Sequence, residues 1–593
     1  MSEWLQAGSV DELHEVGSKL IRGIVVFSHE NGVYAVENAC PHMGFPLNKG
    51  TLCDGILTCH WHHARFDVCS GGTLDPWADD VPSHEIRIEN NQIYVNPLPK
   101  NRRDKASLLR RLREGMEQNI SLIIAKSVIA LVESGVPETE IAEVGIDFGT
   151  TQRAAGWQSG LTILTAMVNV LPKLDYYGRI LALFQGLVHV ARDTDGTPPR
   201  YMLQSLPDSD FPVSRLTAWY RQSVDVRDTD GAERILRAAV AKSSHPTDWS
   251  NMMLTAATDH FYLDGGHTFD FHNKAIEALQ FVNETLKSQV LTSLIPLFSN
   301  PTRSEELQNW QSPVDLVSPL QDAFERLPEV IEAGKRQRET SPSKSNAFHA
   351  AAFVEQILSD NPIATVHALT DSLERGVPPE ILAQLTALAA AKRIQRFHTQ
   401  NDFGDWIAVL HTFTHAHAVH KRLLETPTPF VIRGIYHTAM RIYLDRFLNI
   451  PAAKNPDWRK NIHDTTTLTS LFELTDKNQR VEDAANWVSA YLHHDGDVPD
   501  LMNTFGHLLL REDAEFHSFQ MYEAALSEYD LWSDTIKHSH RPYNEDIAQD
   551  AKDTLLIALV RYLAAHAPTS RELPHVARIA WRLHRGEKLF EEE

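Results

Sequence analysis

Cysteines occur at positions 40, 53, 59 and 69 of this 593-residue chain and nowhere else. Two of them open short loops that also carry histidine, C-P-H at 40–42 and C-H-W-H at 59–62, with sixteen residues between the loops. A disulfide framework is typical of small secreted chains, whereas one thiol and one imidazole in each loop are typical of a metal site. The first hundred residues must therefore fold so that these two loops meet.

Residues 20–100 carry short runs of alternating apolar and polar side chains. The runs LIRGIVVF and GVYAVEN are followed by HEIRIENNQIYVN, in which Asn90-Asn91 separates two alternating segments as in a hairpin turn. The two Cys/His loops interrupt this pattern. We expect a small antiparallel β domain.

The donor set of the loops limits the kind of metal centre. A 2Fe-2S cluster needs four ligands, and in Rieske centres two cysteines hold one iron while two histidines hold the other. One cysteine and one histidine per loop fits this division. A mononuclear zinc site, which also accepts these residue types, and a domain without metal are the alternatives. We interpret Cys53 and Cys69 as packing residues.

The loops and their flanks resemble the Rieske family, through C-P-H-M-G-F-P-L-N-K-G and C-H-W-H-H-A-R-F-D-V-C-S-G-G, within a similarity over residues 1–97. Phe45 and Trp61 stand where the quinol-oxidising type has disulfide cysteines, so the domain looks like the ferredoxins and oxygenase domains of ring-hydroxylating systems. This resemblance implies electron transfer from a ferredoxin reductase or a similar donor. It also implies a 2Fe-2S cluster with the ligands Cys40, His42, Cys59 and His62.

The length and net charge of the chain limit its domain organisation and its possible partners. A single core stops growing near ~250–300 residues, so 593 residues predict several domains. The net charge of −22 opposes binding to nucleic acid. No apolar stretch approaches the ~18 residues of a membrane helix, and the N-terminus does not resemble a signal peptide. We expect a soluble, cytoplasmic protein with neither nucleic acid nor membrane as a partner.

Beyond residue 99, apolar residues recur at helical spacing and strand signals are scarce. This pattern predicts that the large remainder is mainly α-helical. The whole chain is then a multidomain α and β protein. Short similarities favour two related helical halves, residues 133–137 with 374–378 and residues 348–359 with 516–527. Chance similarity between helices is the alternative. The predicted parts are a β domain over 1–99, a basic linker and first helix over 100–116, and helical halves over 117–345 and 346–593.

Histidine is frequent in the helical remainder, where 23 of the 30 histidines follow residue 100. A buried imidazole needs a hydrogen-bond partner or a metal ion. His411 and His415 are four residues apart and so share a helical face, the spacing with which two imidazoles chelate one ion. In a second segment, His260 precedes Gly265-Gly266, which we expect to end a helix in a sharp turn before His267.

The functional hypothesis is an oxidoreductase whose cluster passes electrons to a second metal centre, non-haem iron or haem, in a helical oxygenase-like domain of the monooxygenase or dioxygenase type. Its substrates would be oxygen and a small apolar organic molecule. The helical part is remotely similar to questin-oxidase-like monooxygenases but matches no diagnostic motif, and the Asp-x2-His-x4-His arrangement of oxygenases with an N-terminal Rieske domain is absent. The candidate catalytic residues are His260, His411, His415, His507 and His517.

The alternative hypothesis comes from a different class of protein. The helical imidazoles would then be hydrogen-bonded core residues, and the chain would be an electron-transfer or redox-sensing protein. Its helical part would bind a partner or ligand without catalysis.

Overall fold

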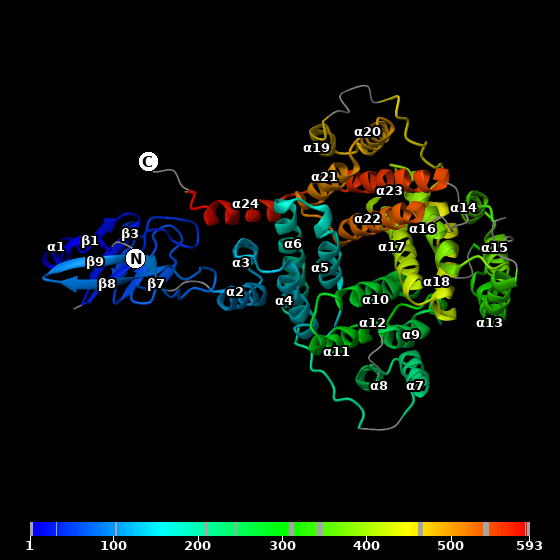
Figure 1. Cartoon of the computed structure of the whole chain (residues 1–593), viewed down its shortest axis with the longest axis horizontal. Coiled ribbons are helices and arrows are strands. Elements are labelled where there is room, and N and C mark those ends of the chain that lie inside the picture. The colour runs from blue at the N-terminus through cyan, green and yellow to red at the C-terminus, as the bar shows by residue number, and fades with distance from the viewer. Residues whose placement is uncertain are drawn as a thin grey trace. The chain divides into compact units, whose positions relative to one another are not determined.

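The chain folds into two compact units, Met1–Val144 with Glu572–Glu593, and Gly145–Arg571 (Figure 1). The first unit contains the β domain, and the second is helical. Among the described residues, no helix is both long enough and apolar enough to cross a membrane. The computed structural model describes residues 4–30, 32–100, 104–207, 211–242, 246–307, 313–340, 348–460, 467–537, 545–587 and 589.

The β domain holds two antiparallel sheets, which confirms the prediction. The larger sheet has the order β1-β9-β8-β4-β3-β2, and the smaller has the order β5-β6-β7. Asn90 and Asn91 form the turn between β8 and β9, and their φ angles of 48° and 64° fit the left-handed residues of a tight hairpin turn. The strands are β1 Leu5–Ser9, β2 Ser18–Ile21, β3 Ile24–His29, β4 Gly32–Glu37, β5 Thr51–Cys53, β6 Ile56–Thr58, β7 Arg65–Asp67, β8 Ser83–Glu89 and β9 Gln92–Pro99.

In the described part of the first unit, three further helices lie wholly within it besides the short α1 (Val10–Val16). They are α2 (Lys105–Glu117), α3 (Ser121–Glu133) and α24 (Glu572–His584). Helix α3 packs against both α2 and α24. Asp104 caps α2 by accepting a hydrogen bond from the Ser107 backbone N–H at 2.8 Å. The predicted extent of the basic linker and first helix, residues 100–116, stays a prediction.

The second unit is built from helices over its described residues, as predicted. They are α4 Glu138–Thr151, which begins in the first unit, α5 Ser159–Val170, α6 Tyr176–Thr194, α7 Val213–Asp225, α8 Thr229–Lys242, α9 Pro246–Ala257, α10 His267–Ala278, α11 Glu284–Ser293, α12 Ile295–Ser299, α13 Val317–Thr340, α14 Ala350–Leu358, α15 Pro362–Glu374, α16 Pro379–Gln395, α17 Phe403–Glu425, α18 Pro429–Asp445, α19 Thr469–Thr475, α20 Val481–His493, α21 Val498–Leu510, α22 Phe516–Lys537 and α23 Glu545–Ala565. The boundary predicted between residues 345 and 346 lies outside the described residues, so two related halves stay a prediction.

Four helices of the second unit pack in a ring. Helix α5 packs against α10 and α22, and α17 packs against the same two helices. The start of α10 is set by a sharp turn in which Asp264, Gly265 and Gly266 all have positive φ, which confirms the turn predicted at the two glycines. His267 is consequently the first residue of α10.

Candidate metal centres

The two Cys/His loops have the same backbone turn. In each, the cysteine N–H donates to the carbonyl five residues later, and the cysteine carbonyl accepts from the N–H four residues later. That fourth residue is Gly44 in one loop and His63 in the other, both left-handed at φ 82° and 62°. The pairs are Cys40 with Phe45 at 2.7 Å and Gly44 at 2.7 Å, and Cys59 with Ala64 at 2.8 Å and His63 at 3.0 Å.

The four predicted ligands lie together where these loops meet. Cys40 and Cys59 are buried in one apolar cluster, and their side chains are hydrogen-bonded to each other. The rings of His42 and His62 are 4.9 Å apart, and His62 is exposed. The sulfur side of the site is therefore buried, and one imidazole reaches solvent.

The electrostatics favour a thiolate at Cys59 and a neutral imidazole at His42, while the hydrogen bond with Cys59, followed by burial, raises the pKa of Cys40. A hydrogen bond from Cys40, followed by backbone N–H groups of its own loop, lowers the pKa of Cys59 to about 6, although burial opposes this. Burial lowers the pKa of His42 to about 4, and the nearby His62 and Lys126 add to the effect. The buried Nδ1 of His42 has no hydrogen-bond partner among the described residues. Such an orphaned lone pair fits a metal ligand.

Comparison with known proteins agrees with this geometry. Residues 3–85 match the model of the Rieske [2Fe-2S] domain. The chain is 32% identical over 97 residues to the ferredoxin component of the naphthalene 1,2-dioxygenase/salicylate 5-hydroxylase systems of Ralstonia sp, covering 93% of that ferredoxin and 16% of this chain. The chain belongs to the Rieske [2Fe-2S] family. Its Rieske domain implies a 2Fe-2S cluster and electron transfer.

Other relatives match the Rieske domain alone. Human apoptosis-inducing factor 3 is 37% identical over 75 residues, and the match spans only 12% of each protein. The solved ferredoxin of carbazole 1,9a-dioxygenase from Nocardioides aromaticivorans IC177 is 24% identical, with a TM-score of 0.16, and covers 16% of this chain and 100% of that ferredoxin. The matched lengths leave the helical unit outside all of these similarities.

The burial of the two cysteines outside the predicted ligand positions differs from the prediction. Cys53 and Cys69 are exposed, so their interpretation as packing residues was wrong. Cys53 ends the short strand β5, and Cys69 follows β7 in the turn that leads to Gly71. The interpretation relied on the apolar character of cysteine, which does not indicate which face of a short strand is buried.

In the helical unit, three histidines converge from three helices. His267 opens α10, His411 lies in α17 and His517 lies near the start of α22. Nε2 of His411 is 2.8 Å from Nε2 of His517, and the ring of His267 is 4.4 Å from that of His411. One ring nitrogen from each lies within 4.8 Å of the others. We call these three residues the histidine cluster.

The surroundings of the histidine cluster favour neutral imidazoles at His411 and His267. Burial, followed by the proximity of His267 and His517, lowers the pKa of His411 to about 2. Burial also lowers the pKa of His267 to about 4. Nδ1 of His517 is 2.8 Å from a carboxylate oxygen of Glu515, an arrangement that orients an imidazole and leaves its Nε2 available.

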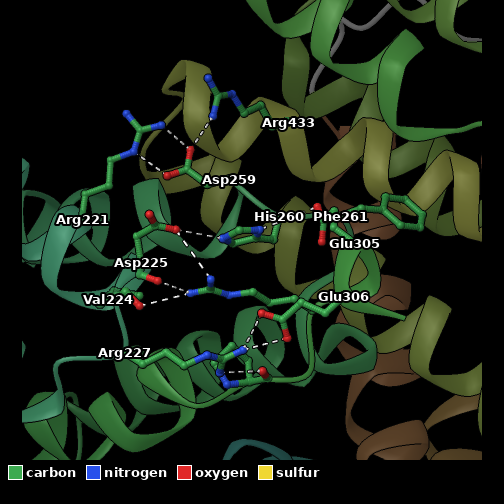
Figure 2. A network of polar contacts seen from close by, with 12 residues as sticks. Arg221, Val224, Asp225, Arg227, Asp259, His260, Phe261, Glu305, Glu306 and Arg433 are labelled. Carbon is green, nitrogen blue, oxygen red and sulfur yellow. Dashed lines mark hydrogen bonds and ion pairs between the residues drawn. The ribbon is translucent and has the colours of Figure 1, made fainter. Parts of the chain in front are cut away.

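Two of the five predicted catalytic histidines, His411 and His517, are in this cluster, and the other three lie elsewhere. Nδ1 of His415 is 2.8 Å from the Thr438 hydroxyl, and Nε2 of His507 is 2.7 Å from Asp175. His260 lies in a network of ion pairs (Figure 2), 3.5 Å from Asp225 and 3.7 Å from Glu305. The predicted catalytic roles of these three residues stay predictions.

His267 was not among the predicted catalytic residues. The sequence placed it directly after the turn at Gly265-Gly266, and this position became the first turn of a buried helix. The turn at Gly265-Gly266 could have pointed to His267 as a candidate. A residue that directly follows two left-handed glycines is held in a fixed position at the start of a helix.

Proposed function

We propose that Cys40, His42, Cys59 and His62 hold the 2Fe-2S cluster, and that the cluster passes electrons to an oxygenase-like helical unit. The supporting geometry for the ligands is the pair of equivalent loops, with both thiols buried and the Nδ1 of His42 left without a partner among the described residues. A ferredoxin reductase or similar donor would supply the electrons one at a time. Such a cluster provides one-electron transfer and no substrate chemistry of its own.

The proposed acceptor is a non-haem iron site at the histidine cluster. Three imidazoles from three helices converge there, and Glu515 stands behind His517 as a hydrogen-bonded carboxylate. Imidazole is a ligand that iron accepts, and a three-residue site leaves positions open for oxygen. An iron ion would supply oxygen activation at this place. The rings of Phe271 and Phe516 lie against His267 and His517 and make the surroundings of this site apolar.

A second candidate function is electron transfer or redox sensing without catalysis. The observation that favours it is the 2.8 Å contact between the Nε2 atoms of His411 and His517, because two imidazoles at that distance can satisfy each other by a hydrogen bond. Under this alternative the helical unit binds a partner or ligand, and the histidine cluster holds no metal.

The ratio of iron to acid-labile sulfide in anaerobically purified protein separates these two functions. The Rieske cluster alone fixes the ratio at two irons per two sulfides. We expect additional iron, and we expect the double variant His411→Ala/His517→Ala to lose only that excess. His507→Gln, on a histidine outside the cluster, is the matched control. An iron-to-sulfide ratio of one in the unaltered protein contradicts the proposed iron site. A haem absorbance band would show that the second metal centre is haem and not non-haem iron.

A further inference from the structure

A second set of buried polar side chains lies deeper on the helices that carry the histidine cluster. Glu277 of α10, His417 of α17 and Glu523 of α22 are almost completely buried, and one ligand atom of each lies within 4.8 Å of the others. His417 follows His411 by six residues and Glu523 follows His517 by six, which places both about 9 Å further along their helices. We call Glu277, His417 and Glu523 the buried triad.

The imidazole of His417 is held in the orientation of a metal ligand. Its Nδ1 is 2.8 Å from Oε1 of Glu528, and Nδ1 of His420 is 2.9 Å from the same oxygen. A carboxylate oxygen accepts hydrogen bonds, so Nδ1 is the donor in both imidazoles. The neutral ring of His417 then carries its lone pair on Nε2. Carboxylate–histidine pairs of this kind commonly stand behind a metal ion.

Nε2 of His417 has no hydrogen-bond partner within the described part of the chain, although the side chain is buried. It lies 3.9 Å from Oε2 of Glu523. A bare nitrogen lone pair beside a buried carboxylate oxygen is unfavourable unless a cation lies between them. That cation is either a proton on Nε2 or a metal ion.

The charges of this region leave room for a further cation. Glu277, Glu523 and Glu528 are buried carboxylates, and the buried ammonium beside them is Lys274. Lys274 Nζ is 2.9 Å from Oε2 of Glu277 and 2.6 Å from Oε2 of Glu523. Among these four buried groups the negative charges exceed the positive by two, which is costly in a buried site. Lys421 at the cavity wall offsets part of this excess at Glu277, and a divalent ion would offset the rest.

A cavity borders the two carboxylates of the triad. It has a volume of about 210 Å³, and both Glu277 and Glu523 line it. Polar groups also line its wall: Asn169, Lys173, Lys421, Glu425, Ser527 and Asp530. The Asn169 amide donates to Glu277 at 2.8 Å and to Glu523 at 3.1 Å, so the two carboxylates are already held side by side.

We propose that Glu277, His417 and Glu523 bind a divalent transition-metal ion, distinct from the iron proposed at the histidine cluster. One imidazole and two carboxylates are a donor set that Mn²⁺, Fe²⁺ and Zn²⁺ accept. Lys274 is the competing cation, because its ammonium holds the carboxylate oxygens that would face the ion. The metal ion and the ammonium therefore exclude each other from these oxygens. This site does not depend on the proposed oxygenase activity.

The test is Mn²⁺ binding to the full chain after chelator treatment, in a His411→Ala background that removes the histidine cluster. With the Rieske cluster kept oxidised, the decrease in the free Mn²⁺ electron paramagnetic resonance signal reports binding. We expect one Mn²⁺ per chain, lost in His417→Gln and in Glu523→Gln. Asp530→Asn, at the cavity wall and outside the triad, is the control that keeps binding.

Lys274→Met separates a metal site from a purely structural ion pair. Removing the competing ammonium tightens Mn²⁺ binding at least about tenfold if the two cations share these oxygens. An ion pair without a metal role predicts weaker folding and no Mn²⁺ in this variant. If Lys274→Met does not fold, the loss of Mn²⁺ binding in Glu523→Gln still tests the proposal. Absence of Mn²⁺ binding at millimolar concentration, or binding that survives Glu523→Gln, overturns the proposal and leaves a proton on His417.

Discussion

Lys126 of α3 donates a hydrogen bond at 2.5 Å to the carbonyl oxygen of Pro41, the residue between Cys40 and His42. The same ammonium pairs with the buried carboxylate of Asp79. Nε of Arg111, from α2, contacts that carboxylate at 2.8 Å. The helices that follow the Rieske domain therefore place two cations beside its first Cys/His loop.

Replacing Lys126 by methionine should lower the reduction potential of the Rieske cluster. A positive charge near the cluster stabilises its reduced, more negative state, so removing that charge favours the oxidised state by ~50 mV. A redox titration followed by the signal of the reduced cluster measures the shift. Lys105→Met, which removes an exposed lysine paired with Glu140, is the matched control. Equal potentials in both variants would show that Lys126 only anchors the loop.

The assignment of His62 as a ligand predicts two different outcomes at one position. His62→Cys should keep iron and move the absorption spectrum toward that of a ferredoxin with four cysteines, because a thiolate can replace the imidazole. His62→Ala should lose the cluster. His63→Gly is the control, since glycine accepts the φ of 62° at that neighbouring position. Unchanged spectra in both His62 variants would refute the assignment.

Glu515 should strengthen metal binding at the histidine cluster without touching the metal. Its carboxylate orients His517, and losing such a partner commonly costs ~10–100-fold in affinity. Glu515→Gln should accordingly lower iron occupancy there in an iron titration, while the sulfide-bound iron stays constant. The exposed Glu473→Gln is the control. Unaltered iron affinity in Glu515→Gln would mean that the hydrogen bond has no influence on ligation.

Asp75 should stabilise the Rieske domain in a pH-dependent way. It accepts hydrogen bonds from the Arg65 backbone N–H at 2.7 Å and from its guanidinium at 2.8 Å. The Arg65 hydrogen bond lowers the pKa of Asp75, although burial opposes this. Because the folded pKa is below the unfolded value, the stabilisation is full at neutral pH and is lost as the pH falls through the folded pKa.

Asp75→Asn should therefore cost about 1–3 kcal/mol at pH 7. The difference from the unaltered protein should shrink at about pH 3, because below ~3.9 the unfolded chain binds a proton that the folded protein binds only at lower pH. Urea unfolding followed by circular dichroism at the two pH values measures it. Asp54→Asn is the surface control. An equal cost at both pH values would mean that the charge of Asp75 contributes nothing.

The sequence alone was sufficient to predict the β domain and to single out its two Cys/His loops. Each loop is short and local, so Cys40 stays near His42 and Cys59 near His62 whatever the rest of the chain does. Alternating apolar residues and Asn90-Asn91 likewise determine the hairpin through contacts between neighbouring segments. What the sequence did not determine there is exposure, as Cys53 and Cys69 demonstrate.

In the helical unit, only the tertiary structure decided which histidines meet. Helical periodicity places His411 and His415 on one face of α17, yet it contains no information on what packs against each turn. His411 meets His517, 106 residues away, while His415 meets the Thr438 hydroxyl. The partners come from helices distant in sequence, and their contacts depend on how those helices pack, which local spacing does not encode.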